Sequence, residues 1–164
     1  MHLEYTKCMR TDLTFDQCEK ILLAEHYGHL GCVENHEPFV YPVTYLYKDG
    51  YIYSHTTEGA KTEMLRKNPH VCLQVEQVTT GYEWSSVMCH GIFQELTNHD
   101  EIHAVQLLLA EQYANISLAE GKVPVSPVLE YIHSLKAEQI RTSIVYRIDV
   151  QKTVGRAERH SQKQ

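Results

Sequence analysis

The 164-residue chain lacks long hydrophobic runs, a secretion signal and a surplus of positive charge. Its longest apolar runs, Ala104–Val105 and Leu107–Ala110, fall far short of the roughly 20 residues that cross a membrane. The N-terminus, Met1–Glu4, shows no charged-then-apolar pattern. Lysine and arginine number 15 against 21 aspartates and glutamates, which gives a formal net charge of -6. We therefore expect neither a membrane protein nor a nucleic-acid-binding protein.

The five cysteines are odd in number and form no CxxC pair, which does not suit a disulfide framework in a domain of this size. Their use predicts a reducing, cytoplasmic environment. Histidine occurs 11 times, and His26, His29, Cys32 and His36 have a spacing that superficially suits zinc. Cys32, however, alternates with Leu30 at an expected core position, and buried free cysteines commonly act as small hydrophobes. We predict no metal site.

Hydrophobic residues make up 43% of the chain and charged residues 22%, as in ordinary globular proteins. The length suits one domain, and neither an internal repeat nor an interdomain linker is visible. We predict a single domain over residues 1–155 and a polar, frayed tail over residues 156–164.

Strand-forming residues dominate the first half of the chain. They are densest over Pro38–Tyr47, and the Asp49-Gly50 turn predicts a hairpin with the returning strand Tyr51–His55. Pro42 indicates an edge strand, a bulge or a place where the backbone faces a ligand. The hairpin has five tyrosines, which suit an aromatic pocket, a dimer surface or packing across the hairpin: Tyr41, Tyr45, Tyr47, Tyr51 and Tyr53.

Further strands are expected over Leu30–Val33, Val71–Val75, Trp84–Glu95 with a bulge at Gly91, and Thr142–Val150. A capping box at Thr14 and Gln17 predicts a helix that ends near His26. Other helices are expected over Ala60–Lys67, Asp100–Tyr113 and Val128–Leu135. About six antiparallel strands with peripheral helices favour a mainly β (α+β) domain built as a small barrel.

The segment Ser54–Lys61 outlines an anion site, because hydroxyl groups, the start of a helix and an ammonium group follow one another. The spacing is not a Walker motif. A solvated lysine beside an ordinary helix cap explains the same pattern. Ser85 and Ser86, which follow Trp84, suit a second polar contact or simply a strand that enters from solvent.

Several segments, taken in order, resemble the flavin-binding split-barrel superfamily of pyridoxamine-5′-phosphate-oxidase-like proteins, and within it the nitroimidazole-resistance branch. The resemblance extends from about Arg10 to Gly155 and rests on order and spacing more than on one motif. The matching segments are Glu37–Tyr45, Tyr51–His55, Gly59-x-Lys61 with Leu65, Asn68-Pro69, Val71-Cys72, Trp84–Gly91 and Arg141–Ile148.

The resemblance implies a six-stranded antiparallel split β-barrel that forms a homodimer, with FMN held between the subunits. Pro42, Val43 and Thr44 would lie along the isoalloxazine ring, largely through backbone groups. Ser54 and His55 would end the strand beneath the flavin, with His55 also the candidate for substrate contact or proton donation. Lys61 would contact the FMN phosphate, and Ser85 and Ser86 would lie near the flavin or its tail.

Two departures from the family pattern argue against pyridoxamine-phosphate oxidation. That oxidase has an arginine early in the strand occupied here by Phe39–Thr44, and a second basic residue where this chain has Ala60. We expect an FMN-dependent oxidoreductase that reduces a small organic molecule, such as a nitroaromatic compound. The alternatives are a non-catalytic flavin carrier or redox-sensing module, and a haem-binding split-barrel protein with His55 as a candidate ligand.

Overall fold

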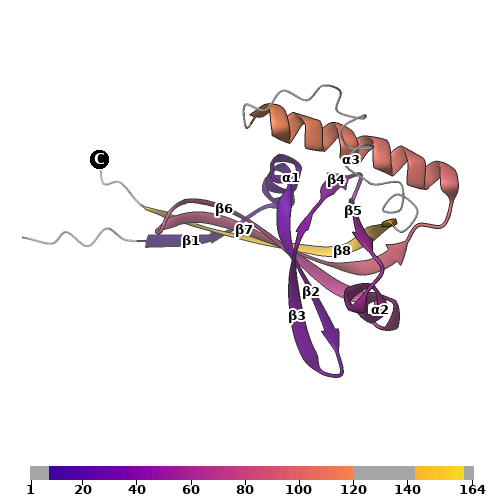
Figure 1. Cartoon of the computed structure of the whole chain (residues 1–164). Helices are drawn as coiled ribbons and strands as arrows, with labels where there is room; N and C mark the ends of the chain where they lie inside the picture. The colour runs from indigo at the N-terminus through magenta and orange to yellow at the C-terminus, as the bar shows by residue number, and fades with distance from the viewer. Residues whose placement is uncertain (1–7, 120–142, 161–164) are drawn as a thin grey trace, which may run out of the picture.

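The computed structural model describes residues 8–119 and 143–160, and it is built around one antiparallel sheet with three helices (Figure 1). The strands are β1 (Cys8–Asp12), β2 (Tyr27–Glu34), β3 (Glu37–Thr44), β4 (Leu46–Lys48), β5 (Tyr51–Thr57), β6 (His70–Thr80), β7 (Glu83–Glu95) and β8 (Ser143–His160). The helices are α1 (Phe15–Ala24), α2 (Ala60–Lys67) and α3 (His99–Ala119). No helix among these residues is long and apolar enough to span a bilayer.

The strand order is β3-β2-β6-β7-β8-β5-β4, and β1 pairs with β8 outside this path. The two end strands, β3 and β4, follow each other in sequence and are separated only by Tyr45. The sheet therefore closes on itself through the covalent chain rather than through hydrogen bonds, which is a split barrel. The predicted fold class is confirmed, with eight strands in place of six.

One of the two extra strands is β1, which the sequence analysis did not predict, and the other arises at Tyr45, where the strand expected over Pro38–Tyr47 is broken. Its first half, β3, pairs with β2, and only its second half, β4, forms the hairpin with β5. Tyr45 is fully buried, and its hydroxyl donates to the Leu22 carbonyl over 3.0 Å. The five tyrosines therefore share no single surface. Pro42 lies on an edge strand, as predicted.

The tail expected to fray after residue 155 is instead ordered as far as His160, because β8 continues through it. Arg156–His160 pairs with β1, and Arg156 to Glu158 also pair with β7. Ala157 is buried, and Arg10 forms an ion pair with Glu158 over 2.7 Å. The polar composition of this segment led to the prediction of a frayed tail. Backbone pairing with two distant strands, which composition does not reveal, orders it.

The structure confirms the predicted helices among the residues that it describes, with some differences in their ends. The capping box at Thr14 and Gln17 is present, although α1 ends at Ala24 rather than near His26. Helix α2 has the predicted bounds, and α3 is longer than expected. The helix expected over Val128–Leu135 lies outside the described residues.

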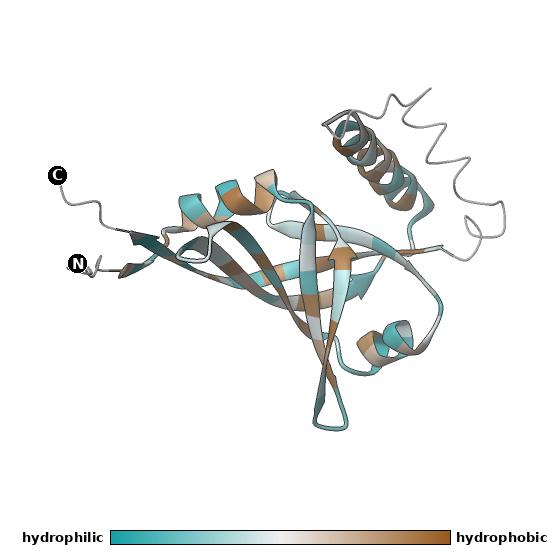
Figure 2. Ribbon diagram, turned by 60° about the vertical axis from the view of Figure 1, so that its left-hand side comes forward, coloured by the Kyte–Doolittle hydropathy of each residue, from teal (hydrophilic) through white to brown (hydrophobic). Residues whose placement is uncertain are grey.

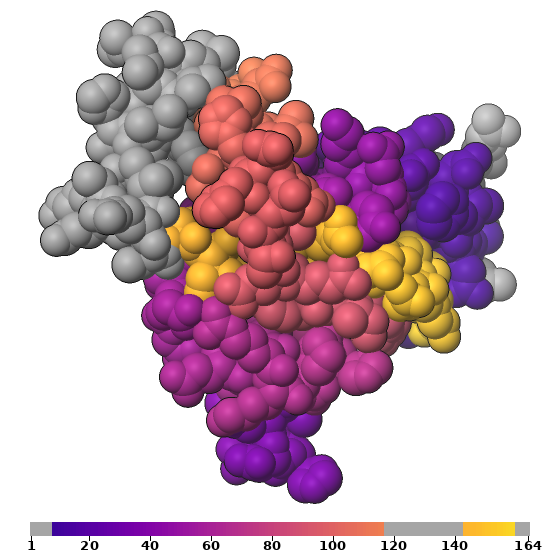
Figure 3. Space-filling model, turned by 90° about the vertical axis from the view of Figure 1, so that its right-hand side faces the viewer, coloured from indigo at the N-terminus to yellow at the C-terminus, as the bar shows by residue number. Residues whose placement is uncertain are grey.

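The core has two parts. The larger fills the barrel and includes Tyr45, Leu73 and Tyr146, all completely buried. The smaller lies between α3 and the outer side of β8, where Val105 and Leu109 pack with Val145. Figure 2 shows hydrophobic and hydrophilic residues alternating along the strands, and Figure 3 shows α3 lying against β8. The apolar residues of α3 thus cover a sheet face that would otherwise meet water.

The bulge predicted at Gly91 is present, because the register between β7 and β8 shifts at His90 and Gly91. A substitution at Gly91 tests how much this bulge contributes to stability. A Cβ atom at Gly91 would lie 2.5 Å from the Asp149 carbonyl oxygen. We expect Gly91→Ala to lower the free energy of unfolding by about 3 kcal/mol through overpacking. Urea denaturation would measure it. Gly81→Ala is the control, since its Cβ meets open space, and equal stability of the two variants would refute the expectation.

Candidate functional site

A split lies between β3 and the segment formed by β5 and the start of α2. Among the described strands, β3 pairs only with β2, so its other backbone edge has no strand partner. At one end of β3 the Ser54 hydroxyl donates to the Thr44 carbonyl over 2.7 Å. About 10 Å further along the strand, the Lys61 ammonium lies 5.8 Å from the centre of the Tyr41 ring. The fold therefore brings together Thr44, Ser54 and Lys61, which the sequence analysis singled out.

Lys61 is half-buried at the first turn of α2, and no described carboxylate forms an ion pair with it. Burial lowers the pKa of its ammonium, because a charge removed from water is destabilised. Its described neighbours are the Tyr41 ring and, at longer range, the Cys32 thiol. A desolvated cation beside a helix N-terminus is well suited to receive an anion.

His55 follows Ser54 on β5, so its side chain points to the opposite side of the strand. Its ring lies edge-on against Tyr113 of α3, with the centroids 6.1 Å apart. Burial first, and then the positive charge of Lys61, lower the pKa of His55 below its ordinary value, which favours the neutral imidazole at pH 7. A neutral imidazole offers an N–H donor without a net charge.

Two tyrosines complete the polar surroundings of the Thr44 end. The Tyr113 hydroxyl lies close to the Thr44 side chain, and burial raises the pKa of this phenol. Tyr146 of β8 lies next to Ser54, and burial raises its pKa to about 12. Both phenols are therefore neutral hydrogen-bonding groups at physiological pH.

Pro42 and Val43 contribute differently from Thr44. The Val43 side chain packs in the barrel core, which leaves only its backbone for a ligand. Pro42 is exposed on the outer face of β3 and has no N–H. The role predicted for this segment, contact through backbone groups, is compatible with this arrangement and stays a prediction.

Ser85 and Ser86 do not join the split within one chain. The Ser85 hydroxyl accepts a hydrogen bond from Arg159 over 2.8 Å, and the Ser86 hydroxyl accepts one from Gln74 over 3.1 Å. On β8, Ser86 pairs with Arg156, whereas His55 pairs with Val145. These positions are about eleven residues apart, or roughly 35 Å of extended strand. One small ligand cannot contact both ends of this strand in the same subunit.

The residues with a zinc-like spacing between His26 and His36 do not come together as a metal site. Among the residues that the structure describes, no group of three histidine, cysteine or acidic residues could hold a metal ion. Cys32 lies in the core, where its thiol contacts the Met64 sulfur over 3.2 Å. His29 and His36 are exposed.

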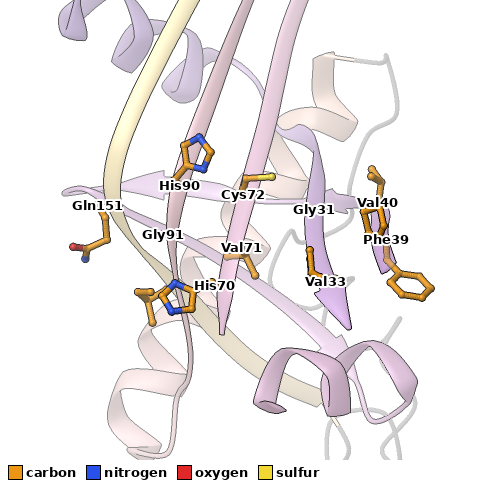
Figure 4. Close-up of a pocket in the computed structure, with 13 residues that line it drawn as sticks. Gly31, Val33, Phe39, Val40, His70, Val71, Cys72, His90, Gly91 and Gln151 are labelled. Carbon is orange, nitrogen blue, oxygen red and sulfur yellow. The ribbon is translucent and has the colours of Figure 1, made fainter. Parts of the chain in front are cut away.

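A separate groove of about 630 Å³ crosses the outer face of β2, β6 and β7 (Figure 4). Gly31, Cys72 and His90 form one cross-strand row along its floor. Val33 and Val40 form one side of the groove, and Gln151 lies at the opposite side. The groove is on the other side of the sheet from the barrel core, and it is mostly apolar.

Comparison with known proteins identifies the family of this chain. A model of the pyridoxamine 5'-phosphate oxidase family matches residues 14–157. That span contains the split, both phenols and every residue predicted for the site. The chain belongs to this family.

Three proteins similar to this oxidase-family member cover different shares of its chain. An uncharacterised protein of Rhizobium meliloti is 31% identical over 98 residues, which cover 57% of this chain and 65% of that protein. A FAD-binding protein of Mesorhizobium loti is 25% identical, with a TM-score of 0.71 over 94% of this chain and 100% of that one. A candidate 5-nitroimidazole antibiotic resistance protein of Bacteroides thetaiotaomicron, 21% identical, has a TM-score of 0.70 over 96% and 95%.

Sequence reasoning missed the two tyrosines that approach the split from outside β5. Both fall within elements that the sequence predicts, Tyr113 in the helix over Asp100–Tyr113 and Tyr146 in the strand over Thr142–Val150, but neither was predicted for the site. A phenol on an apolar stripe is itself a signal, because a buried tyrosine hydroxyl needs a hydrogen-bond partner. That signal does not say which distant residue supplies the partner.

Proposed function

We propose that this oxidase-family member binds a flavin, FMN in the first instance, in the split between β3 and α2. The observation that carries the proposal is Lys61, a desolvated cation without a described counter-ion at one end of the split. Membership of the family and the fold of the FAD-binding protein of Mesorhizobium loti support a flavin. The length of β3 between Lys61 and Ser54 suits an aromatic ring with a phosphorylated tail.

The residues of the split have complementary tasks in this proposal. Lys61 and the first backbone N–H groups of α2 bind the phosphate, which a partly desolvated ammonium favours. The free backbone edge of β3 and the Thr44 and Ser54 hydroxyls orient the ring. His55 is held neutral and donates a hydrogen bond to the bound substrate. The flavin, when bound, supplies the hydride and electron chemistry.

The proposed substrate is a small oxidised organic molecule, with nitroaromatic compounds the first class to test. The similarity in fold to the candidate nitroimidazole resistance protein motivates this choice. All five cysteines are free thiols, which supports the reducing, cytoplasmic location predicted from cysteine usage.

We further propose a homodimer through the outer face of β2, β3, β6, β7 and β8. Alternation along the strands and their register place five exposed hydrophobic side chains on this face, and an exposed apolar surface of this kind marks an interaction site. They are Tyr27, Val33, Val40, Val78 and Val154. A second copy also explains Ser86, whose side chain lies on this face and contacts the partner's flavin in this arrangement, because its own split is too distant. Ser85 is buried on the other face of β7, so only its backbone is available to the partner's flavin.

An absorption spectrum of the purified protein tests the flavin, before and after addition of FMN or FAD and dialysis. We expect a retained flavin spectrum with quenched fluorescence. Reduction by nicotinamide nucleotides at a useful rate would then favour an enzyme over a flavin carrier. A colourless protein that retains neither flavin would contradict the proposal, and a Soret band after haem addition would favour the haem-binding alternative.

A further inference from the structure

The bend at Tyr45, between β3 and β4, is held by three hydrogen bonds, one each to α1, to the loop that follows α1, and to α3. The Tyr45 N–H donates to the His26 carbonyl over 2.9 Å, and its hydroxyl donates to the Leu22 carbonyl over 3.0 Å. Its own carbonyl accepts from Nε2 of Gln112, on α3, over 2.6 Å. Because Thr44 precedes Tyr45, this bend sets the position of the Thr44 end of the split.

Gln112 also fixes the protonation state of His26. Its side-chain nitrogen lies 2.9 Å from Nδ1 of His26 as well as 2.6 Å from the Tyr45 carbonyl oxygen. An amide nitrogen has two hydrogens, one for each of these acceptors. The arrangement requires a lone pair on Nδ1, and therefore a neutral His26 with its proton on Nε2.

A proton on Nδ1 of His26 would break this arrangement. Imidazolium has no acceptor, so its N–H would face the N–H of Gln112. Rotation of the amide would satisfy His26, but it would place Oε1 of Gln112 against the Tyr45 carbonyl oxygen. Oε1 is buried and has no hydrogen-bond partner in the described structure, so rotation is not opposed by the loss of a bond there. Two N–H groups that face each other repel, so the amide either moves away from His26 or rotates, and in both cases the Tyr45 carbonyl loses its donor.

The groups around His26 line a small cavity. A cavity of about 250 Å³ between α1, β4 and α3 is lined by His26 and Gln112 together with Glu25, Tyr47 and Glu111. No lysine or arginine is among its described lining residues. Glu25 accepts from the Gln77 amide over 2.8 Å. Tyr47 donates to Glu19 over 3.2 Å, and burial raises its pKa to about 12, so it stays neutral.

The next residue of α3 extends the effect to the split. Tyr113 lies close to the Thr44 side chain and edge-on against His55. Two consecutive residues of α3 thus contact the Tyr45 carbonyl and the surroundings of Thr44. We propose that Gln112 is a positioning residue that, through neutral His26, makes the Thr44 end of the flavin split sensitive to pH. This inference rests on the proposed flavin function.

The first test uses the protein without flavin. Nitrogen NMR of labelled histidine at pH 8 should show His26 as the Nε2–H tautomer. The Tyr45 N–H donates to the His26 carbonyl, and a bend that has lost the bond from Gln112 to the Tyr45 carbonyl should open more often and expose this N–H. Amide hydrogen exchange of Tyr45, corrected for the intrinsic pH dependence of exchange, should therefore be about tenfold less protected at pH 5.5 than at pH 8, the size expected for one hydrogen bond. The matched variant is His26→Asn, whose side-chain oxygen accepts from Gln112 without titrating. Its Tyr45 protection should not change with pH. An Nδ1–H tautomer, or equal pH dependence in both proteins, would overturn the proposal.

The second test measures FMN affinity by fluorescence quenching between pH 5.5 and pH 8. We expect the affinity of the wild type to fall about tenfold further than that of His26→Asn over this range. Protonation of the FMN phosphate and of His55 is common to both proteins and cancels in the comparison. Parallel curves would overturn the coupling between His26 and the split. Absence of FMN binding at every pH, with the expected exchange result, would refute the flavin function and leave the hydrogen bond between His26 and Gln112 established.

Discussion

Replacing Lys61 with alanine is expected to weaken FMN binding about 10- to 100-fold, the range for losing a charge-assisted hydrogen bond to an anion. The half-buried ammonium has no described carboxylate partner, so its removal breaks no ion pair of the folded protein. The stability without flavin should therefore stay the same or rise slightly, because an unfavourable desolvation is relieved. Fluorescence titration with FMN and thermal unfolding of the flavin-free protein measure the two effects.

Lys67→Ala is the matched control for Lys61→Ala, since it removes the same charge from the other end of α2. Lys67 is exposed and pairs with Glu34 over 2.9 Å, an interaction worth little at a surface. We expect its FMN affinity to equal that of the wild type, while Lys61→Arg retains most of the binding. Equal FMN affinity in the wild type and Lys61→Ala would contradict the placement of the phosphate at α2.

Replacing Val154 with aspartate is expected to convert the proposed homodimer into monomers. Val154 is 47% exposed in one chain and lies on the outer face of β8. In a two-fold interface one substitution places two uncompensated carboxylates, and we expect dimer affinity to fall about 100-fold or more. Light scattering coupled to size-exclusion chromatography would measure the mass in solution, and a flavin titration would show a parallel loss of affinity.

Leu23→Asp controls for added negative charge, because Leu23 is 58% exposed on α1 and lies outside the proposed interface. It should leave the dimer intact. A monomeric wild type would refute the homodimer, whereas a Val154→Asp dimer would show that another surface associates. In either case the split in each chain remains a candidate flavin site, but the contribution of Ser85 and Ser86 from the partner is lost.

The sequence predicted best the features that depend on neighbouring residues. The capping box at Thr14, both ends of α2 and the Asp49-Gly50 hairpin depend on spacings of a few residues, and the structure confirms each. The break at Tyr45 was not predicted, because strand-forming residues continue without interruption on both sides of it. What breaks the strand is the packing of Tyr45 against α1 and α3, which are distant in sequence.

The residues of the candidate site also differ in whether local sequence could reveal them. Lys61, Thr44 and Ser54 were found from local pattern and family resemblance, and the structure brings them to one split. Tyr113, Gln112 and His26 could not be found, because their roles arise from contacts across 60 to 90 residues, about half the chain, which only folding creates. Ser85 and Ser86 remain a prediction whose test lies in the assembly rather than in the single chain.

The pairing of β1 with the end of β8 determines how this protein can be engineered. Cys8 and His160 are register partners, so the described chain begins and ends at neighbouring positions. Both lie beyond the strand segment that carries Ser86 and Arg156, far along β8 from the split. A short peptide linking these ends, with new termini opened at the exposed Gly81 turn, would therefore give a circular permutant with an undisturbed split.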